Sequence, residues 1–209
     1  MEYLTISDGQ FPRLAHSAVT MGKFDGIHRG HRKLIRRILE QKEETGAAAV
    51  VLAFVSDRKM ILTKAERRDL LERLGVDVLL ECPLDGRLKH MKAENFIKQI
   101  LVGSLHASYM AVGEDFRFGY ERKGTPDLLE KNGEKYGFVT EVLSKEMDGD
   151  RKFSSTYIRE ELNRGNMEKT AGLLGCDFYV SGTVEHGRGM GHRTFFPTAN
   201  IIPPPEKLM

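Results

Sequence analysis

A ten-residue stretch, GKFDGIHRGH at residues 22–31, holds the residue types best suited to chemistry. It follows the apolar run 18–21, a predicted buried strand, and leads into residues 31–44, whose apolar spacing predicts a helix. His28 and His31 are then expected on one side of the first helical turn, where free N–H groups and the positive end of the helix dipole attract anions. Because open α/β sheets bind ligands at the carboxyl ends of their strands, the sequence predicts an anion site here.

The residues alone leave three interpretations of the two histidines open. They can be ordinary polar loop residues, or they can be zinc ligands with the nearby Asp25 as a third ligand. In the third interpretation they donate hydrogen bonds to a phosphate whose charge grows during a reaction. The HExxH spacing typical of zinc enzymes does not occur, and neither does a P-loop motif or a GxGxxG motif after the first predicted strand.

A second polar cluster, FSSTYIR, occupies residues 153–159. Ser154, Ser155 and Thr156 start a predicted helix, and Arg159 follows one turn later. Hydroxyl groups at such positions are most often helix caps. Together with helix N–H groups and a guanidinium they can also hold phosphates, so both interpretations stay open for this cluster.

Strand and helix patterns alternate over most of the chain. Apolar runs of the kind found in strands that are covered on both faces predict strands at 18–21, 47–54, 76–82, 108–113 and 137–143. Helical patterns occur at 31–44, 63–75, 93–101, 127–136 and 155–175, and the second of these opens with a capping box formed by Thr63 and Glu66. This order predicts the α/β class, with a doubly wound parallel sheet and right-handed crossovers.

The character of the sequence changes near Cys176. Beyond it the chain is rich in Gly, Pro and β-branched residues, and no helical pattern returns. We therefore predict two domains, residues 1–176 and 177–209, the second being the start of an all-β unit. About thirty residues cannot bury a core of their own, so this segment is either a fragment of a larger domain or packed on the first one.

The bulk properties narrow the class of protein. The chain has 209 residues and a formal net charge of +2, so no overall field favours nucleic acid or an anionic membrane, and neither is expected as a partner. Cys82 and Cys176 form no CxxC pair, which fits a reducing compartment. The N-terminus has no signal-peptide pattern, and the longest apolar run, 47–55, is far shorter than the roughly 20 residues that span a bilayer. A cytoplasmic location is therefore expected.

Four stretches together resemble one family. GKFDGIHRGH resembles the GxFDGxHxGH signature of the HxGH nucleotidyltransferase superfamily, and FSSTYIR resembles its second signature, SSTxIR. VGEDFRFG at residues 112–119 resembles the VGxxFRFG segment of the prokaryotic bifunctional riboflavin kinase/FMN adenylyltransferases, also called FAD synthetases. GTVEHGRGMGHRTFFPTANI at residues 182–201 is similar to the opening of that family's riboflavin kinase barrel. The resemblance covers nearly the whole chain, with the motifs in the family's order.

The resemblance implies a Rossmann-like nucleotidyltransferase domain that transfers AMP from ATP to FMN and releases FAD and pyrophosphate. Magnesium is then expected on the phosphate oxygens of ATP rather than in a protein cage, with Asp115 as the one protein group that could assist. The catalytic residues implied by the matching motifs are His28, His31 and Arg159. Those implied to bind ATP or its phosphates are Gly22, Phe24, Asp25, Gly26, Ser155 and Thr156. Those implied for flavin are Asp115, Phe116 and Arg117, and those matching the kinase are Thr198 and Asn200.

The chain also departs from the family pattern. The segment AFVSDRKMIL at residues 53–62 lacks the Phe-x-Pro-His-Pro loop, Asp115 stands where many members have Asn, and Phe195 replaces a Gly. Because the sequence ends at Met209, we expect no riboflavin kinase activity from these residues alone. The alternatives are an adenylyl- or cytidylyltransferase with another phosphate acceptor, and a non-catalytic flavin or nucleotide binder. The sequence predicts no oligomeric state.

Overall fold

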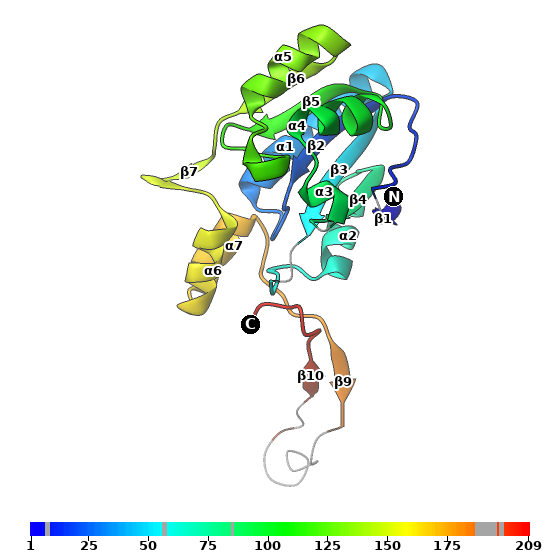
Figure 1. The fold of residues 1–209 in the computed structure, drawn as a ribbon. Coiled ribbons are helices and arrows are strands. Elements are labelled where there is room, and N and C mark those ends of the chain that lie inside the picture. The colour runs from blue at the N-terminus through cyan, green and yellow to red at the C-terminus, as the bar shows by residue number, and fades with distance from the viewer. Residues whose placement is uncertain (7–8, 56–57, 85, 187–195, 197–198) are drawn as a thin grey trace.

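A parallel sheet forms the centre of the computed structural model, which describes residues 1–6, 9–55, 58–84, 86–186, 196 and 199–209. Its six strands lie in the order β1-β4-β3-β2-β5-β6, and all five neighbouring pairs are parallel (Figure 1). The strands are β1 (Glu2–Thr5), β2 (Ser17–Gly22), β3 (Ala48–Val55), β4 (Val78–Pro83), β5 (Ala107–Gly113) and β6 (Val139–Leu143). The α/β class and the five predicted strands are confirmed, while β1 was not predicted.

Helices cover both faces of the sheet because successive side chains of each strand point to opposite faces. Val19 and Met21 of β2 pack in one core cluster, and Ala18 packs in the other. The Ala18 face is covered by α1 (Arg29–Thr45) and α2 (Lys64–Arg73). The opposite face is covered by α4 (Ala93–Asn95), the π-helical turn η1 (Phe96–Val102) and α5 (Pro126–Tyr136).

Local signals set the ends of several helices. Thr63 and Glu66 make both hydrogen bonds of the predicted capping box at the start of α2. The predicted helical stretch after residue 155 forms two helices, α6 (Ser155–Asn163) and α7 (Met167–Leu174). Between them Gly165 has a φ of 74°, a left-handed conformation that a glycine adopts without steric cost and that ends a helix.

Short elements complete the described chain: helix α3 (Gly86–Lys89), the 3₁₀ turn η2 (Tyr120–Arg122), and two antiparallel hairpins. One hairpin joins β7 (Met147–Asp148) to β8 (Arg151–Lys152), and the other joins β9 (Thr183–Glu185) to β10 (Asn200–Ile202). Figure 1 shows the β9–β10 hairpin projecting away from the sheet. It agrees with the β-rich character predicted after residue 176, whereas the division into two domains at that residue stays a prediction. In the part of the chain that the structure describes, no helix has the length and apolar character that crossing a membrane requires.

The strand order determines where a ligand can bind. The chain runs outward from β2 through β3 to β4, and then returns to place β5 on the other side of β2. The connections therefore diverge between β2 and β5, which leaves a crevice at the carboxyl ends of these two strands. The loops that leave β2 after Gly22 and β5 after Gly113 meet there.

Candidate active site

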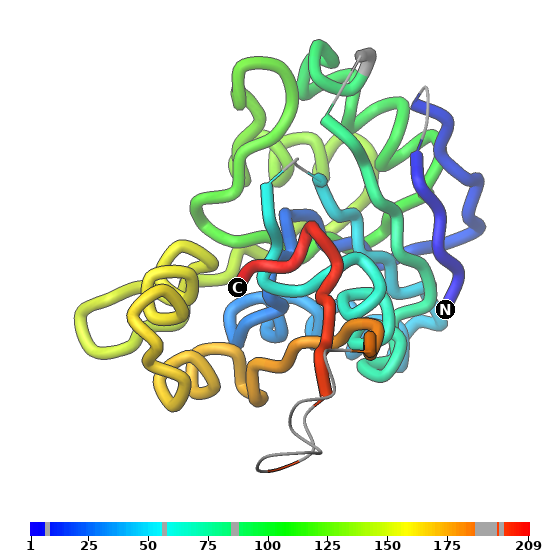
Figure 2. The backbone as a smooth tube through the Cα atoms, turned by 90° about the horizontal axis from the view of Figure 1, so that it is seen from below, coloured from blue at the N-terminus to red at the C-terminus, as the bar shows by residue number. Residues whose placement is uncertain are grey.

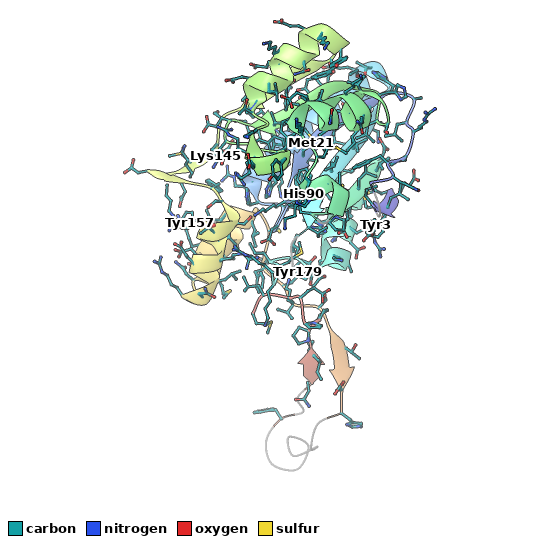
Figure 3. All side chains as sticks on the ribbon, viewed as in Figure 1. Tyr3, Met21, His90, Lys145, Tyr157 and Tyr179 are labelled. Carbon is teal, nitrogen blue, oxygen red and sulfur yellow. The ribbon has the colours of Figure 1, made fainter. Side chains whose placement is uncertain are left out.

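A cavity of about 490 Å³ opens at this crevice. Its walls come from the loops after β2, β3, β5 and β6 and from the first turn of α6, and Met21 and Lys145 (both labelled in Figure 3) belong to its lining. The three predicted motifs lie far apart in sequence, at residues 22–31, 112–119 and 153–159, yet each contributes to this one cavity. The predicted site residues that line it are Gly22, Asp25, His28, His31, Asp115, Phe116, Arg117, Ser155, Thr156 and Arg159.

The two histidines lie together at the start of α1. His28 is the N-cap residue, and its Nδ1 accepts a hydrogen bond from the backbone N–H of His31 at 3.3 Å. The two rings are stacked, with centroids 3.7 Å apart and planes 20° apart. Among the described side chains, Nδ1 of His31 is one of the few buried polar atoms without a hydrogen-bond partner, so it is a group that a ligand can satisfy.

Both imidazoles are neutral near pH 7. Burial and the nearby charge of Lys145 lower the pKa of His28 from 6.5 to about 4, outweighing a backbone hydrogen bond that raises it. Burial and then the neighbouring His28 hold the pKa of His31 well below 6.5. Because Nδ1 of His28 accepts the capping hydrogen bond, the proton of its neutral ring is on Nε2, which makes that nitrogen a donor.

The loop between β2 and α1 has an unusual backbone. Phe24, Gly26 and Ile27 have φ values of 46°, 90° and 41°, so two residues with side chains adopt a left-handed conformation. Such conformations cost about 1–3 kcal/mol each and are concentrated at functional sites. Of the residues predicted to bind ATP, Phe24 and Gly26 do not belong to the described lining of the cavity: Phe24 is fully buried, with its ring 5.0 Å from that of His31. These two residues shape the loop.

Asp25 joins the first motif to the SSTxIR-like motif. Its carboxylate accepts hydrogen bonds from the backbone N–H of Ile61 at 2.8 Å and from Nη2 of Arg159 at 2.6 Å. Its backbone carbonyl accepts a hydrogen bond from the hydroxyl of Ser155 at 2.8 Å. Both carboxylate oxygens are therefore engaged, and Asp25 holds the guanidinium of Arg159 in place instead of joining the histidines as a zinc ligand.

The start of α6 combines capping groups with cavity residues. Ser154 is the N-cap residue and accepts the backbone N–H of Tyr157 at 3.2 Å. Thr156 is exposed in the first turn, on the lining of the cavity. The cap and phosphate-binding interpretations are therefore compatible, because Ser154 caps the helix and the following residues face the cavity.

The loop after β5 forms the opposite wall. Phe116 stacks on Phe118 with ring centroids 5.6 Å apart and planes 14° apart, which offers a flat aromatic surface. Asp115 forms an ion pair with Lys145, and Arg117 donates to the backbone carbonyl of Phe116 at 2.7 Å. The negative charge of Asp115 is thus offset by a lysine from the loop after β6.

The loop after β6 is part of the site, although it was not among the site segments predicted from the sequence. Lys145 follows the predicted strand 137–143 by two residues, which was the signal that could have identified it. From α1, Lys33 donates to the carbonyl of Ser144 at 3.3 Å and holds this loop against the cavity. The cavity is lined by more cationic than acidic side chains: Lys23, Lys33, Arg58, Arg117, Arg122, Lys145 and Arg159 against Asp25, Asp115 and Glu146. The site therefore favours anions although the whole chain is nearly neutral.

Of the two residues that match the kinase motif, only Asn200 is described, and it does not belong to the described lining of this cavity. Thr198 lies outside the described residues, as does Phe195. Asn200 is an exposed residue of β10 that pairs with Glu185 of β9. Its predicted role in the kinase stays a prediction.

The doubly wound sheet, with its ligand cavity at the β2–β5 crevice and its histidine pair at the start of α1, defines a protein of the nucleotidyltransferase-like α/β class. Comparison with known families specifies the class further. The sequence matches the FAD synthetase family over residues 11–157 and the riboflavin kinase family over residues 174–209. This chain belongs to the FAD synthetase family.

Individual proteins show the same similarity. The chain is 37% identical over 193 residues to the bifunctional riboflavin kinase/FMN adenylyltransferase of Escherichia coli K12, covering 88% of this chain and 62% of that protein. It is 34% identical over 198 residues to the protein of the same name from Buchnera aphidicola subsp. Acyrthosiphon pisum, covering 90% and 63%. The chain thus spans about three-fifths of the length of these relatives.

Similarity to a solved structure supports the fold. A crystal structure of a protein named macrolide-efflux protein, from Streptococcus pneumoniae, superposes with a TM-score of 0.88 at 26% sequence identity. The match covers 100% of this chain and 71% of that one. The agreement extends over the whole arrangement of sheet and helices described above.

Proposed function

We propose that this chain transfers AMP from ATP to FMN, forming FAD and pyrophosphate. The observation that carries the proposal is the convergence of the loops at 22–31, 113–119 and 153–159 on one cationic cavity, with two neutral imidazoles at the start of α1. FMN and ATP are both phosphate anions, so a cavity with this charge suits both substrates. Membership in the FAD synthetase family supports the same assignment.

The proposed reaction is an in-line displacement at the α-phosphorus of ATP. An oxygen of the FMN phosphate forms a bond to that phosphorus, and the bond from the phosphorus to the bridging oxygen breaks, so that pyrophosphate leaves with the electron pair. The nucleophile is already anionic and needs no strong general base. The work of the protein is therefore to align the two phosphates and to stabilise the charge that builds up on the oxygens of the α-phosphate.

The histidines are placed to stabilise that charge. Nε2 of His28 is the free donor of a ring whose other nitrogen is held by the α1 cap, so its orientation is preorganised. His31 stacks on it and brings a buried nitrogen without a partner among the described atoms. A donor that needs no reorientation as charge develops is worth far more than the same group in water.

The leaving pyrophosphate is assigned to the start of α6. Ser155, Thr156 and the guanidinium of Arg159 line the cavity there, next to the amino end of a nine-residue helix. Asp25 pairs with Arg159 at 2.6 Å and so fixes its direction before substrate arrives. A planar guanidinium can bind two phosphate oxygens at once.

Magnesium enters this proposal as part of the substrate. The described residues include no cluster of three or more His, Cys, Asp or Glu side chains that could hold a metal. The three acidic residues of the cavity lining, Asp25, Asp115 and Glu146, are paired with Arg159, Lys145 and Lys33. The phosphate oxygens of ATP are therefore the expected ligands of magnesium.

The flavin is assigned to the wall formed by the loop after β5. Phe116, with its ring stacked on that of Phe118, is the flat apolar group on this side, and Phe54 of β3 also belongs to the cavity lining. Aromatic side chains stack on planar ring systems with an energy beyond that of area burial, about 0.5–1.5 kcal/mol for a pair. The isoalloxazine ring of FMN has the shape that such a surface fits.

The test is to incubate the purified chain with FMN, ATP and magnesium and to separate the flavins by chromatography. FAD and pyrophosphate are expected in equal amounts, and both are expected to disappear in His31→Ala but not in His186→Ala, whose histidine lies outside the cavity lining. If FMN binds but no FAD forms, the chain is a binder. If FMN does not bind, the phosphate acceptor is another compound, and phosphopantetheine and nicotinate mononucleotide would be tested next.

A further inference from the structure

The extended segment 59–61 forms hydrogen bonds along both of its edges. On the edge that faces the cavity, the carbonyl of Lys59 accepts from Nη2 of Arg159. On the same edge, the N–H of Ile61 donates to Asp25 at 2.8 Å. This segment thus contacts both members of the Asp25–Arg159 ion pair, and its position determines where the guanidinium lies.

The opposite edge of the same segment pairs with the end of the chain. Met60 donates its N–H to the carbonyl of Glu206 at 2.6 Å and accepts at its carbonyl from the N–H of Leu208 at 2.7 Å. These two bonds make a parallel β-bridge between Met60 and Lys207. Met60 thus bonds the C-terminal residues through both of its backbone groups, while the carbonyl of Lys59 and the N–H of Ile61 bond Arg159 and Asp25. Figure 2 shows the C-terminal end crossing the molecule at this place.

Lys207 anchors the bridge. Its side chain is fully buried, and its Nζ donates to the carbonyl of Ile61 at 2.8 Å and to Glu66 at 2.7 Å. The ammonium group also lies 4.6 Å from the ring centroid of Phe178 and 5.3 Å from that of Tyr179, the latter labelled in Figure 3. A buried ammonium is tolerated only when its donors are satisfied, and here the structure supplies two oxygens and two aromatic rings.

The partner carboxylate is tied into the same arrangement. Glu66 caps α2 through the N–H of Thr63 and accepts from the hydroxyl of Ser181 at 2.7 Å with its other oxygen. Burial alone would raise the pKa of Glu66, but the hydrogen bonds from Lys207, Ser181 and Thr63 hold it below its usual value. Two pieces of the segment that follows residue 176 therefore converge on one buried carboxylate of the first domain.

We propose that residues 206–208, the C-terminal strap, hold segment 59–61 in the position that directs Arg159 at the leaving phosphates, and that Lys207 is a positioning residue for ATP. The identity of the ligand rests on the proposed function, whereas the connection between the strap and Arg159 does not. If the strap strengthens the binding of a ligand at Arg159, then by thermodynamic linkage that ligand stabilises the docked strap by the same free energy. Residues 206–208, part of the segment that matches the riboflavin kinase family, thereby influence the nucleotide site although none of the three belongs to the cavity lining.

The test uses the full chain with Lys207→Met and Glu66→Gln combined, which removes both buried charges together so that neither is left unpaired. We expect the amides of Met60 and Ile61 to exchange hydrogen faster, with exchange in β2 and β5 unchanged. We expect KM for ATP to rise about three- to tenfold, as is typical for residues that act through others, while kcat changes less than about twofold. Val184→Thr, on the exposed face of β9, is the matched control and should change neither.

A second variant keeps the proposal testable if the first does not fold. Leu208→Pro removes the N–H that bonds the carbonyl of Met60 and leaves the buried charges in place. Faster exchange at Met60 together with a raised KM supports the strap in either variant. A folded variant with unchanged exchange and unchanged KM overturns it.

Failure of the proposed function would look different. In that case the wild-type chain forms no FAD, and ATP binding measured by equilibrium dialysis takes the place of KM. Addition of ATP should then still change the exchange rate of the Leu208 amide in the wild-type chain. If ATP leaves the hydrogen-exchange rate of the Leu208 amide unchanged, the linkage between the strap and the ATP site is wrong, whether or not the chain makes FAD.

Discussion

Replacement of His28 tests the candidate site most directly, because its imidazole has two separable roles. Nδ1 caps α1 by accepting the N–H of His31 at 3.3 Å, and Nε2 is the donor assigned to the α-phosphate. Asparagine is among the best N-cap residues, so the side-chain oxygen in His28→Asn keeps the cap, while its shorter side chain places no N–H donor where Nε2 of the imidazole was. His28→Ala removes both.

The magnitudes follow from these roles. Loss of one preorganised donor to a developing oxyanion lowers kcat by about 10²–10³, and this loss is expected in both variants. Loss of an N-cap costs about 0.5–2 kcal/mol of stability. The capping bond of His28 is long, at 3.3 Å, so the lower end of that range is expected for His28→Ala and almost no loss for His28→Asn.

The pH dependence of stability gives an independent readout of the same residue. The pKa of His28 is about 4 in the folded chain and 6.5 in the unfolded chain, so between these values the unfolded state binds the proton and the folded state does not. The free energy of unfolding therefore falls as pH drops from 6.5 towards 4, by about 3 kcal/mol at 1.36 kcal/mol per pKa unit. His28→Asn removes this loss, so its stability should depend less on pH in that window.

Two measurements check this prediction. FAD formation is followed by chromatography at pH 7 under single-turnover conditions, and urea unfolding is followed at pH 7 and pH 5. His186→Ala serves as the control for loss of a histidine outside the cavity lining. The reasoning is refuted if His28→Asn keeps turnover within tenfold of the wild type, or if its stability falls between pH 7 and pH 5 as steeply as that of the wild type.

Three further predictions concern other parts of the structure. Lys145→Met should lower kcat/KM about tenfold or more, as for loss of a charged hydrogen bond, and should raise the pKa of His28 in an NMR titration; an unchanged titration would contradict their proximity. Asp115→Asn should lower KM for ATP up to about fivefold, since it frees Lys145 from an exposed ion pair, and a higher KM would argue that Asp115 assists binding. Glu81→Gln should cost about 3 kcal/mol or more in urea unfolding because it leaves the fully buried Arg67 unpaired, and a loss below about 1 kcal/mol would contradict the burial of that pair.

Much of the fold was predictable because its signals are local. The strands β2 to β5 are largely buried and mainly apolar, and α2 begins at a capping box that can be identified from four consecutive residues. The edge strand β1 was missed because it is four residues long, half exposed and paired on one side only, so it carries no apolar run. The turn between α6 and α7 was not predicted, because its only local signal is one glycine, Gly165, within an otherwise helical pattern.

In the candidate site, too, the residues marked by local sequence signals were predictable and those that depend on distant contacts were not. The positions of His28, His31, Ser155 and Arg159 after predicted strands or at predicted helix starts, together with the family resemblance, were enough to expect a phosphate site. The role of Lys145 could not be assigned, because its neighbours in the site come from other parts of the chain.

The sequence by itself determined which functional groups this protein has and at which element ends they occur, since strand runs, caps and motifs are short-range patterns. The tertiary structure alone decided their states and partners. Asp25 and Arg159 are 134 residues apart in sequence, and Lys207 is 141 residues from Glu66. The neutral form of His28 likewise results from burial and from the charge of Lys145. Desolvation and charge interactions depend on distances in space, which the chain acquires only when the sheet has assembled.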